Sequence, residues 1–202
     1  MNRQVQDAYI VAAARTPIGK APRGALRHVR PDDLLVTAIR GALAQAPSLD
    51  PKAIEDAIIG CAIPEAEQGL NVARIGVLLA GLPDTVGGVT VNRFCASGLT
   101  AVAMAADRIR VGEADLMIAG GTESMSLVPM MGNKPAMNPR IFDGNEHIGI
   151  AYGMGLTAEK VAQQWKVSRE DQDAFAVQSH QRAIAGQKAG EFADETVAVA
   201  FT

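Results

Sequence analysis

The hydrophobic pattern of the first 126 residues alternates between short, continuous apolar runs and longer segments in which apolar residues recur at helical spacing. Continuous runs are typical of strands buried on both faces, whereas a period of about 3.6 residues indicates an amphipathic helix. Strands are predicted over residues 8–14, 56–62, 86–91 and 114–119, and helices over 32–46, 71–80 and 96–111. This alternation predicts an α/β fold with a mainly parallel, mixed sheet.

The pattern changes after residue 126. Residues 128–150 contain three prolines, three glycines and a cluster of methionines without a clean period, which predicts a long excursion or a lid. Two helices are predicted next, over 157–165 and 168–188. Ser168 and Asp171 resemble a capping box, so the second of these helices is expected to begin there.

Cys95 lies at the junction between the strand 86–91 and the helix 96–111. The free N–H groups and the positive end of the helix dipole at such a position favour the thiolate, which is the nucleophilic form of cysteine. Cys95 is therefore a candidate nucleophile, although free cysteines are also common as inert packing residues. The other cysteine, Cys61, is interpreted as a core residue because it lies inside a predicted strand, away from any helix end.

The helix that follows Cys95 has small side chains on nearly every side, since it contains Ala101, Ala103, Ala105 and Ala106 and has Gly98 in its first turn. A helix of this composition is typical of a buried position. We therefore expect a central helix that is enclosed by other layers, with another backbone close to its first turn at Gly98.

Four segments of the chain resemble signatures of the thiolase family and occur in the same order as in that family. They are residues 10–19 (IVAAARTPIG), 92–98 (NRFCASG), 119–126 (AGGTESMS) and 154–162 (MGLTAEKVA). The resemblance implies two similar α/β halves with a loop domain inserted in the first, in a chain roughly twice as long as this one. In the family, the nucleophilic cysteine begins a buried helix, which is the position of Cys95.

On this resemblance, the chain corresponds to the first half of the fold and part of the loop domain. The expected organisation is an α/β domain with the nucleophile over residues 1–126, a loop domain over 127–195 and the start of a strand over 196–202. The last segment alternates as a strand does but stops without a turn or a partner, so we expect a cut there rather than a natural terminus.

The resemblance also implies the activity. Thiolases transfer an acyl group between a cysteine and coenzyme A, cleaving 3-ketoacyl-CoA to acetyl-CoA and a shortened acyl-CoA, or running the reverse Claisen condensation. Coenzyme A and acyl-CoA are substrates, and no permanently bound cofactor is expected. Met154 would line the acyl pocket. Biosynthetic acetoacetyl-CoA thiolases commonly carry a histidine just before this methionine, where this chain has Gly153, so we expect a degradative enzyme of fatty acid β-oxidation.

The family's activating histidine and its second cysteine come from the C-terminal half, and neither motif occurs in this sequence. We therefore expect the 202-residue chain to be inactive by itself and to need that missing half. The intact protein is expected to be a homodimer or homotetramer.

Several other interpretations of these residues are open. His147 and Cys95 would form a hydrolase pair, but Arg93 stands where a strained nucleophile turn usually needs a small residue. His28 and His180 are interpreted as structural or surface residues. A non-catalytic acyl-CoA-binding or lipid-binding fragment and a biosynthetic acetoacetyl-CoA thiolase are the alternative functions.

Two further motifs have competing interpretations. Residues 153–158 match the dinucleotide-binding pattern G-x-G-x-x-G/A, but no strand is predicted before them, and Asp173 lies within a helix rather than at a strand end. Residues 120–124 (GGTES) follow a buried strand, so we interpret them as a hydrogen-bonded turn that supports the Cys95 helix.

The composition argues against several classes of binding partner. The net charge is −3 and no segment interleaves basic with aromatic residues, which argues against nucleic acid. Two cysteines make neither a disulfide framework nor a metal-ligand cluster. No apolar run has the length of a membrane span and the first residues lack the core of a signal peptide, so we expect a cytoplasmic protein without a membrane partner.

Overall fold

The computed structural model describes residues 5–144 and 148–200, and the chain forms two compact units. The first unit comprises Met1–Lys134 and Asp194–Thr202, and the second comprises Pro135–Ala193. The first unit continues beyond residue 126 because Glu65 holds the following loop. The Glu65 carboxylate accepts hydrogen bonds from the Asn133 backbone N–H at 2.7 Å and from the Asn133 side-chain amide at 3.3 Å.

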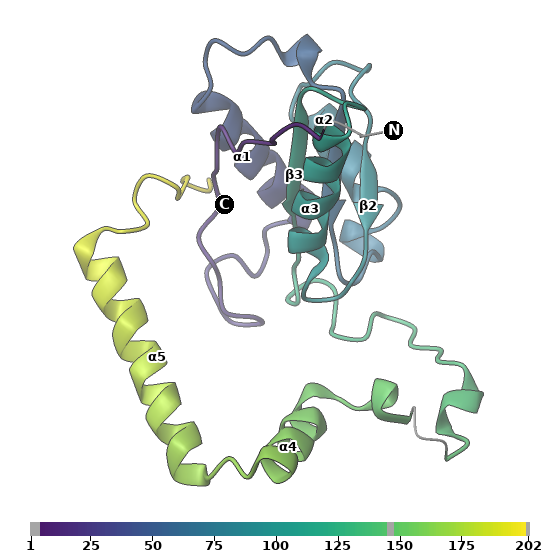
Figure 1. Cartoon of the computed structure of the whole chain (residues 1–202), viewed down its shortest axis with the longest axis vertical. Helices are drawn as coiled ribbons and strands as arrows, with labels where there is room; N and C mark the ends of the chain where they lie inside the picture. The colour runs from purple at the N-terminus through teal and green to yellow at the C-terminus, as the bar shows by residue number, and fades with distance from the viewer. Residues whose placement is uncertain (1–4, 145–147, 201–202) are drawn as a thin grey trace. The chain divides into compact units, whose positions relative to one another are not determined.

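The first unit is built on a three-stranded sheet in the order β2-β1-β3 (Figure 1). Its strands are β1 (Asp56–Gly60), β2 (Val89–Val91) and β3 (Met117–Gly121), and both pairings are parallel. The register aligns Ile58 with Val89 on one side and with Ala119 on the other. This arrangement confirms the predicted α/β class, and it leaves β2 and β3 as the edge strands.

Helices cover both faces of this sheet (Figure 1). They are α1 (Pro31–Ala44), α2 (Val72–Leu79) and α3 (Ser97–Arg110). Ala57 and Ile59 of β1 pack in one apolar cluster with α1 and α2, whereas Ile58 packs with Ala101 and Ala105 of α3. Successive residues of a strand point to opposite faces, so β1 supplies the core on both sides of the sheet.

The helix ends follow local sequence signals. Pro31 begins α1, where the missing proline N–H costs no hydrogen bond, and the Asn71 side chain caps α2 by accepting the Arg74 N–H. Short 3₁₀ helices lie in the connections, at Pro51–Ala53, Ala66–Gln68, Pro139–Phe142 and Ile148–Ala151.

The second unit contains α4 (Met154–Trp165) and α5 (Arg169–Ala189). The Ser168 hydroxyl accepts the Asp171 backbone N–H at 3.1 Å, and Gly190 ends α5 with a φ of 74°. These contacts confirm the predicted start and stop of α5. Helix α4 begins at Met154, earlier than the predicted start at residue 157.

The predicted buried strand over residues 8–14 is wrong. Tyr9 is 76% exposed and Ile10 is 79% exposed, and the segment runs as extended chain. Among the described residues, the ladder contact in this part of the chain is a parallel bridge between Arg15 and Thr196. Residues 197–200 of the predicted strand at 196–202 form no strand, and its last two residues lie outside the described residues. An apolar run favours burial, but a strand also needs a neighbour for its backbone groups, and a cleft separates this segment from β3.

The prediction that helix α3 is enclosed by other layers is also wrong for this chain. Ala101 and Ala105 are buried against the sheet, but Leu99 is 76% exposed and Met104 is 42% exposed. Among the described residues of the first unit, the sheet covers one face of α3 and no second layer covers the outer one. The helix therefore has an uncovered apolar side, next to Cys95.

Candidate active site

Cys95 lies on a tight turn between β2 and α3. Phe94 has a φ of 45°, in the left-handed region that non-glycine residues rarely adopt, and the turn is held by side chains. The Asn92 side-chain oxygen accepts the Phe94 N–H at 2.8 Å. The Ser97 hydroxyl accepts the Arg93 N–H at 2.8 Å and donates to the Phe94 carbonyl at 2.6 Å. Cys95 is exposed at the top of this turn.

The turn lies where the carboxyl end of β2 leads into the first turn of α3. Ala96 is the N-cap residue and provides no side-chain cap, so the first N–H groups of the helix receive no acceptor from it. The predicted position of Cys95, just before the helix, agrees with this geometry. Open α/β sheets commonly bind ligands at this edge, outside the carboxyl ends of their strands.

A glycine of β1 permits the close approach of α3 to the sheet. A Cβ at Gly60 would lie 2.4 Å from the Ser97 carbonyl carbon and 2.5 Å from the Gly98 nitrogen. The predicted approach of another backbone to the first turn of α3 is therefore present, but Gly60 permits it rather than Gly98, because a Cβ at Gly98 would meet nothing within 4 Å. The close contact lies at Gly60 because the backbone of the first turn of α3 packs directly against the carboxyl end of β1.

The segment after β3 is held by hydrogen bonds, as predicted, but they join it to the start of α1 and to the segment after β1 rather than to α3. Thr122 donates through its hydroxyl to the Pro31 carbonyl at 2.6 Å, and the Glu123 carboxylate accepts the Ala62 N–H at 2.6 Å. Gln68 is fully buried and joins this turn to the segment after β1. Its amide donates to Glu123 and to the Ile63 carbonyl, and its oxygen accepts the Ser124 N–H at 3.0 Å.

Cys61 is the first residue after β1 and is only 1% exposed. Burial, followed by the negative charge of Glu123, raises the pKa of the Cys61 thiol from 9.0 to about 11. Both effects disfavour the thiolate, so Cys61 is a packing residue and a poor nucleophile near neutral pH.

The raised pKa of Cys61 makes a prediction about stability at alkaline pH. In the unfolded chain the thiol loses its proton near pH 9, whereas in the folded chain it holds the proton to about pH 11. The contribution of the neutral Cys61 thiol to the unfolding free energy is therefore complete below pH 9 and is lost as the pH rises through 11. We expect the difference in unfolding free energy between the native chain and Cys61→Ala, measured by urea titration, to shrink over that interval. An unchanged difference would contradict the burial of a neutral thiol.

The other candidates from the sequence are distributed over both units. His28 is exposed in the first unit and His180 is exposed on α5. His147 lies outside the described residues. Met154 is the first residue of α4, in the second unit, and is 69% exposed.

The dinucleotide-binding interpretation does not fit the second unit. The 3₁₀ helix Ile148–Ala151, not a strand, precedes Gly153, and Asp173 forms an ion pair with Arg169 at 2.9 Å within α5. A dinucleotide site needs a strand before the glycine turn and an acidic residue at a strand end.

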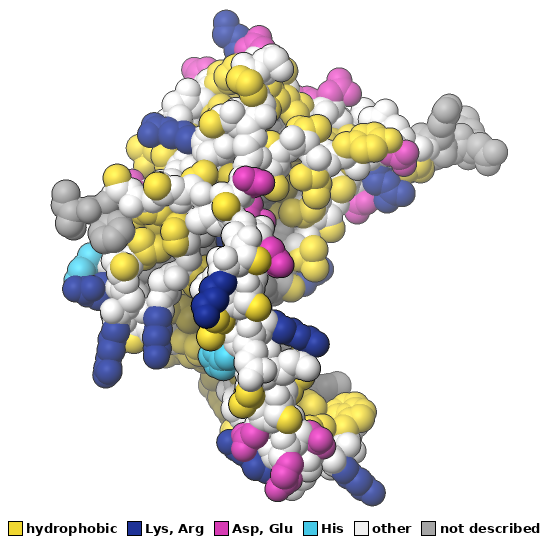
Figure 2. All heavy atoms as spheres, turned by 90° about the vertical axis from the view of Figure 1, so that its left-hand side faces the viewer, with side chains coloured by type: hydrophobic (Ala, Val, Ile, Leu, Met, Phe, Trp, Pro, Cys, Tyr) yellow, Lys and Arg dark blue, Asp and Glu magenta, His cyan; other side chains and the backbone are white. Residues whose placement is uncertain are grey.

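Two absences apply to the described residues, 5–144 and 148–200. No cluster of three histidine, cysteine or acidic side chains is arranged to hold a metal ion, and none of the helices is both long enough and apolar enough to cross a bilayer. On the face drawn in Figure 2, basic and acidic side chains are interspersed with exposed hydrophobic ones.

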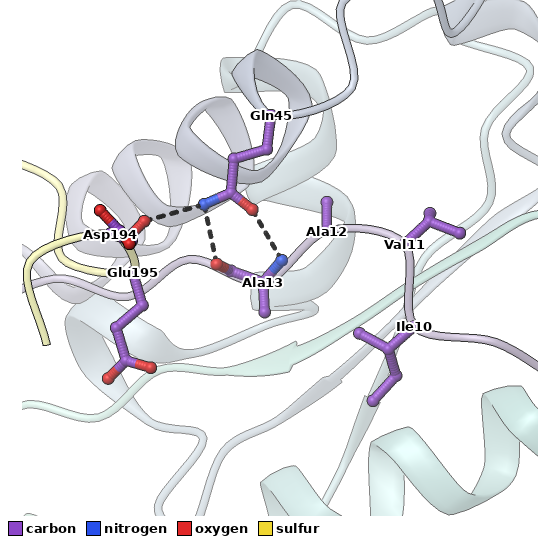
Figure 3. Close-up of a pocket in the computed structure, with 7 residues that line it drawn as sticks. All are labelled: Ile10, Val11, Ala12, Ala13, Gln45, Asp194 and Glu195. Atoms are coloured by element: carbon purple, nitrogen blue, oxygen red, sulfur yellow. Dashed lines mark hydrogen bonds between the residues drawn. The ribbon is translucent and has the colours of Figure 1, made fainter. Parts of the chain in front are cut away.

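Two hollows border the N-terminal segment in the first unit. The smaller hollow has a volume of about 490 Å³, and the Gln45 side chain lines it (Figure 3). This side chain accepts the Ala13 N–H and donates to the Ala13 carbonyl, each at 2.9 Å, and so bonds the segment as a neighbouring strand would. The larger, which we call the β3 cleft, has a volume of about 890 Å³. Its walls are residues 6–16, the apolar sides of α1 and α3, and the edge strand β3.

Three residues that shape the site were not identified from the sequence: Asn92, Gly60 and Gln68. A glycine that ends an otherwise apolar strand is a signal of close backbone approach, and Gly60 has that pattern. Asn92, at the end of a strand, has the pattern of a side chain that bonds to the backbone two residues on. Gln68 carried no local signal, because its partners lie at distant positions in the sequence.

An exposed cysteine on a strained strand-to-helix turn, above the carboxyl ends of parallel strands, defines an α/β protein with a candidate cysteine nucleophile. Residues 8–202 match the family model described as "Thiolase, N-terminal domain". The match covers nearly the whole chain, and the protein therefore belongs to the thiolase family, as the four sequence segments indicated.

Relatives and a solved structure agree with this membership. The chain is 51% identical over 198 residues to the 3-ketoacyl-CoA thiolase of Bacillus subtilis (strain 168), covering 98% of this chain and 50% of the relative. It is 44% identical to the 3-oxoadipyl-CoA/3-oxo-5,6-dehydrosuberyl-CoA thiolase of Escherichia coli (strain K12), covering 96% and 52%. The crystal structure of the Bacillus anthracis acetyl-CoA acetyltransferase matches with a TM-score of 0.83 at 31% identity, covering 100% of this chain and 52% of that one.

These comparisons confirm the thiolase-like fold. The chain spans about half the length of the curated relatives that it matches.

Proposed function

We propose that this chain is the nucleophile-bearing half of a thiolase and that Cys95 carries the acyl group. The observation that supports this most directly is the exposure of Cys95 on a strained turn just before α3, within the segment that resembles a thiolase signature. Cys61 is buried with a raised pKa and does not compete for the role.

The proposed reaction is thiolytic cleavage of a 3-ketoacyl-CoA. The Cys95 sulfur attacks the keto carbon, the bond between that carbon and its neighbour breaks, and the electron pair leaves as the enolate of acetyl-CoA, which takes a proton. The thiol of a second coenzyme A then attacks the acyl-enzyme and releases the shortened acyl-CoA. Proton transfers in such steps contribute about 10² to 10⁴ in rate, so their carriers are essential. The histidine and second cysteine that the family uses for them are absent from this sequence.

The proposed substrate class is a 3-ketoacyl-CoA of fatty acid degradation. Gly153 precedes Met154, where biosynthetic enzymes of the family commonly have a histidine, and a glycine leaves more room beside the acyl chain. Met154, exposed at the start of α4, is proposed to line the acyl pocket. The Bacillus subtilis relative is named a 3-ketoacyl-CoA thiolase, which supports a 3-ketoacyl-CoA as the substrate.

The proposed partner is the C-terminal half of a thiolase fold. The β3 cleft supports this, because an edge strand with unused backbone groups and two apolar helix sides face the same hollow. A strand from another segment would satisfy those groups and cover the apolar walls. The uncovered side of α3, with Leu99 and Met104, is a second surface that a partner would bury. A homodimer or homotetramer is the proposed assembly.

A fusion experiment tests the proposed function. The 202-residue chain is joined to the C-terminal half of the Bacillus subtilis relative, and thiolysis of 3-ketoacyl-CoA substrates of several lengths is measured. We expect turnover by the fusion and none by the chain alone, and light scattering of the fusion reports the assembly.

Each other outcome of that experiment has a defined meaning. Turnover by the chain alone would contradict the need for the second half and would make His147 the first residue to mutate. A folded fusion that binds acyl-CoA without turnover would favour the non-catalytic alternative. A strict preference for acetoacetyl-CoA would favour the biosynthetic one.

A further inference from the structure

A chain of hydrogen bonds crosses the carboxyl ends of all three strands and ends at the Cys95 turn. Glu123, after β3, accepts the Ala62 N–H at 2.6 Å. The carbonyl of Ala62, after β1, accepts the Asn92 side-chain amide at 2.9 Å. Asn92, after β2, accepts the Phe94 N–H through its own side-chain oxygen at 2.8 Å. One side chain, that of Asn92, therefore connects the nucleophile turn to the centre of the sheet.

The turn needs such a connection because its backbone is strained. Phe94 has a φ of 45°, and a non-glycine residue keeps such a sparsely populated conformation only where the surrounding structure holds it there. The hydrogen bond from the Phe94 N–H to Asn92 satisfies the donor that this conformation exposes. The second bond, to Ala62, prevents the Asn92 side chain from rotating away.

We propose that Asn92 is a positioning residue for Cys95: its side chain fixes the sulfur relative to the first turn of α3 by holding Phe94 and Ala62 at once. The inference rests on the proposed function, because positioning matters only if Cys95 transfers acyl groups. Attack on a thioester carbonyl requires the sulfur and the N–H groups that stabilise the oxyanion to act together on one carbon. Simple alkylation of an exposed thiol requires no such alignment.

The difference between these two reactions gives the experiment. The folded 202-residue chain is treated with S-phenyl thioacetate, and acetylation of Cys95 is followed by mass spectrometry. The Cys95 sulfur forms the new bond to the acetyl carbon, its proton goes to solvent and thiophenolate leaves. A parallel sample is treated with iodoacetamide, with Cys61 of the same chain as the internal reference for unfolding. Asn92→Ala removes both hydrogen bonds, and the neutral Asn92→Ser keeps a hydroxyl that is able to accept the Phe94 N–H.

We expect Asn92→Ala to slow acetylation about ten- to a hundredfold, the range that a misplaced reacting group produces, and to leave alkylation within about twofold. Asn92→Ser should recover part of the acetylation rate. Asn71 provides the matched control, because its side chain likewise bonds two backbone groups, accepting the Arg74 N–H and donating to the Gly88 carbonyl at 2.8 Å. Asn71→Ala should lower stability without changing the ratio of acetylation to alkylation at Cys95.

The outcomes separate the two proposals. If Cys95 is acetylated neither in the native chain nor in its fusion with the C-terminal half, the proposed function is overturned and this inference falls with it. If only the fusion is acetylated, the same variants are compared in the fusion. If the native chain is acetylated and Asn92→Ala is acetylated equally fast, only the positioning role is overturned. A parallel fall in both reactions, or new alkylation of Cys61, would mean that the asparagine maintains the fold rather than the alignment of the thiol, and would also overturn it.

Discussion

Replacing Cys95 with serine is expected to abolish thiolysis in the fusion with a C-terminal thiolase half. Loss of a catalytic nucleophile typically lowers kcat by about 10⁴ to 10⁶, because the covalent route closes and only binding and oxyanion stabilisation are left. A hydroxyl on the same turn would have the right position but would be a far weaker nucleophile at neutral pH. The measurement is steady-state cleavage of a 3-ketoacyl-CoA, together with mass spectrometry of the acyl-enzyme.

The matched control for this variant is Cys61→Ala. Cys61 is buried against the core and its thiolate is disfavoured, so its removal should reduce stability while leaving kcat within a few fold. The opposite pattern, in which Cys95→Ser retains an acyl-enzyme and Cys61→Ala loses it, would refute the assignment of the nucleophile.

Gly60→Ala is expected to cause the largest loss of stability among single substitutions near the site. The new methyl group would lie 2.4 Å from the Ser97 carbonyl carbon and 2.5 Å from the Gly98 nitrogen, and both are backbone atoms that have no rotamer to change. Overpacking of a core typically costs about 1–3 kcal/mol, and contacts this close to backbone should reach or exceed the upper end. Because α3 must move away from β1, the Cys95 turn should move with it, and acetylation of Cys95 should fall as well. Urea titration and the thioester assay measure the two effects.

Gly98→Ala is the control for that substitution. It places the same methyl group in the first turn of α3, where nothing lies within 4 Å. Since alanine is a better helix former than glycine by about 1 kcal/mol, Gly98→Ala should be neutral or stabilising. Equal losses from both variants would contradict the assignment of the close contact to Gly60, because neither helix propensity nor a steric clash predicts a loss from Gly98→Ala.

The local features of this protein were predictable from its sequence. Periodicity of apolar residues located the three helices of the first unit and the strands that became β1, β2 and β3. Capping by Ser168 and the position of Cys95 just before α3 followed from residues within a few positions of each other. Such features depend on contacts between sequence neighbours, which a linear pattern records directly.

Two errors of sequence interpretation, at residues 8–14 and at the outer side of α3, share one cause. The apolar segment 8–14 does not form a strand because a ladder needs a partner, and the β3 cleft lies between this segment and the sheet. The outer side of α3 is exposed, although its composition suits burial, because the described residues of the first unit provide no layer to cover it. An apolar composition favours burial of a segment. Burial also requires that another part of the structure supply the surface that covers the segment.

The sequence by itself determined the α/β class, the family and the junction at which Cys95 lies. Only the tertiary structure decided how that junction is held: the left-handed turn at Phe94, its hydrogen bonds through Asn92 to Ala62, and the glycine at position 60 that admits α3. Those contacts join the ends of strands that are far apart in the chain. A sequence pattern records spacing along the chain, whereas close approach between backbones is set by how the strands and helices pack in space.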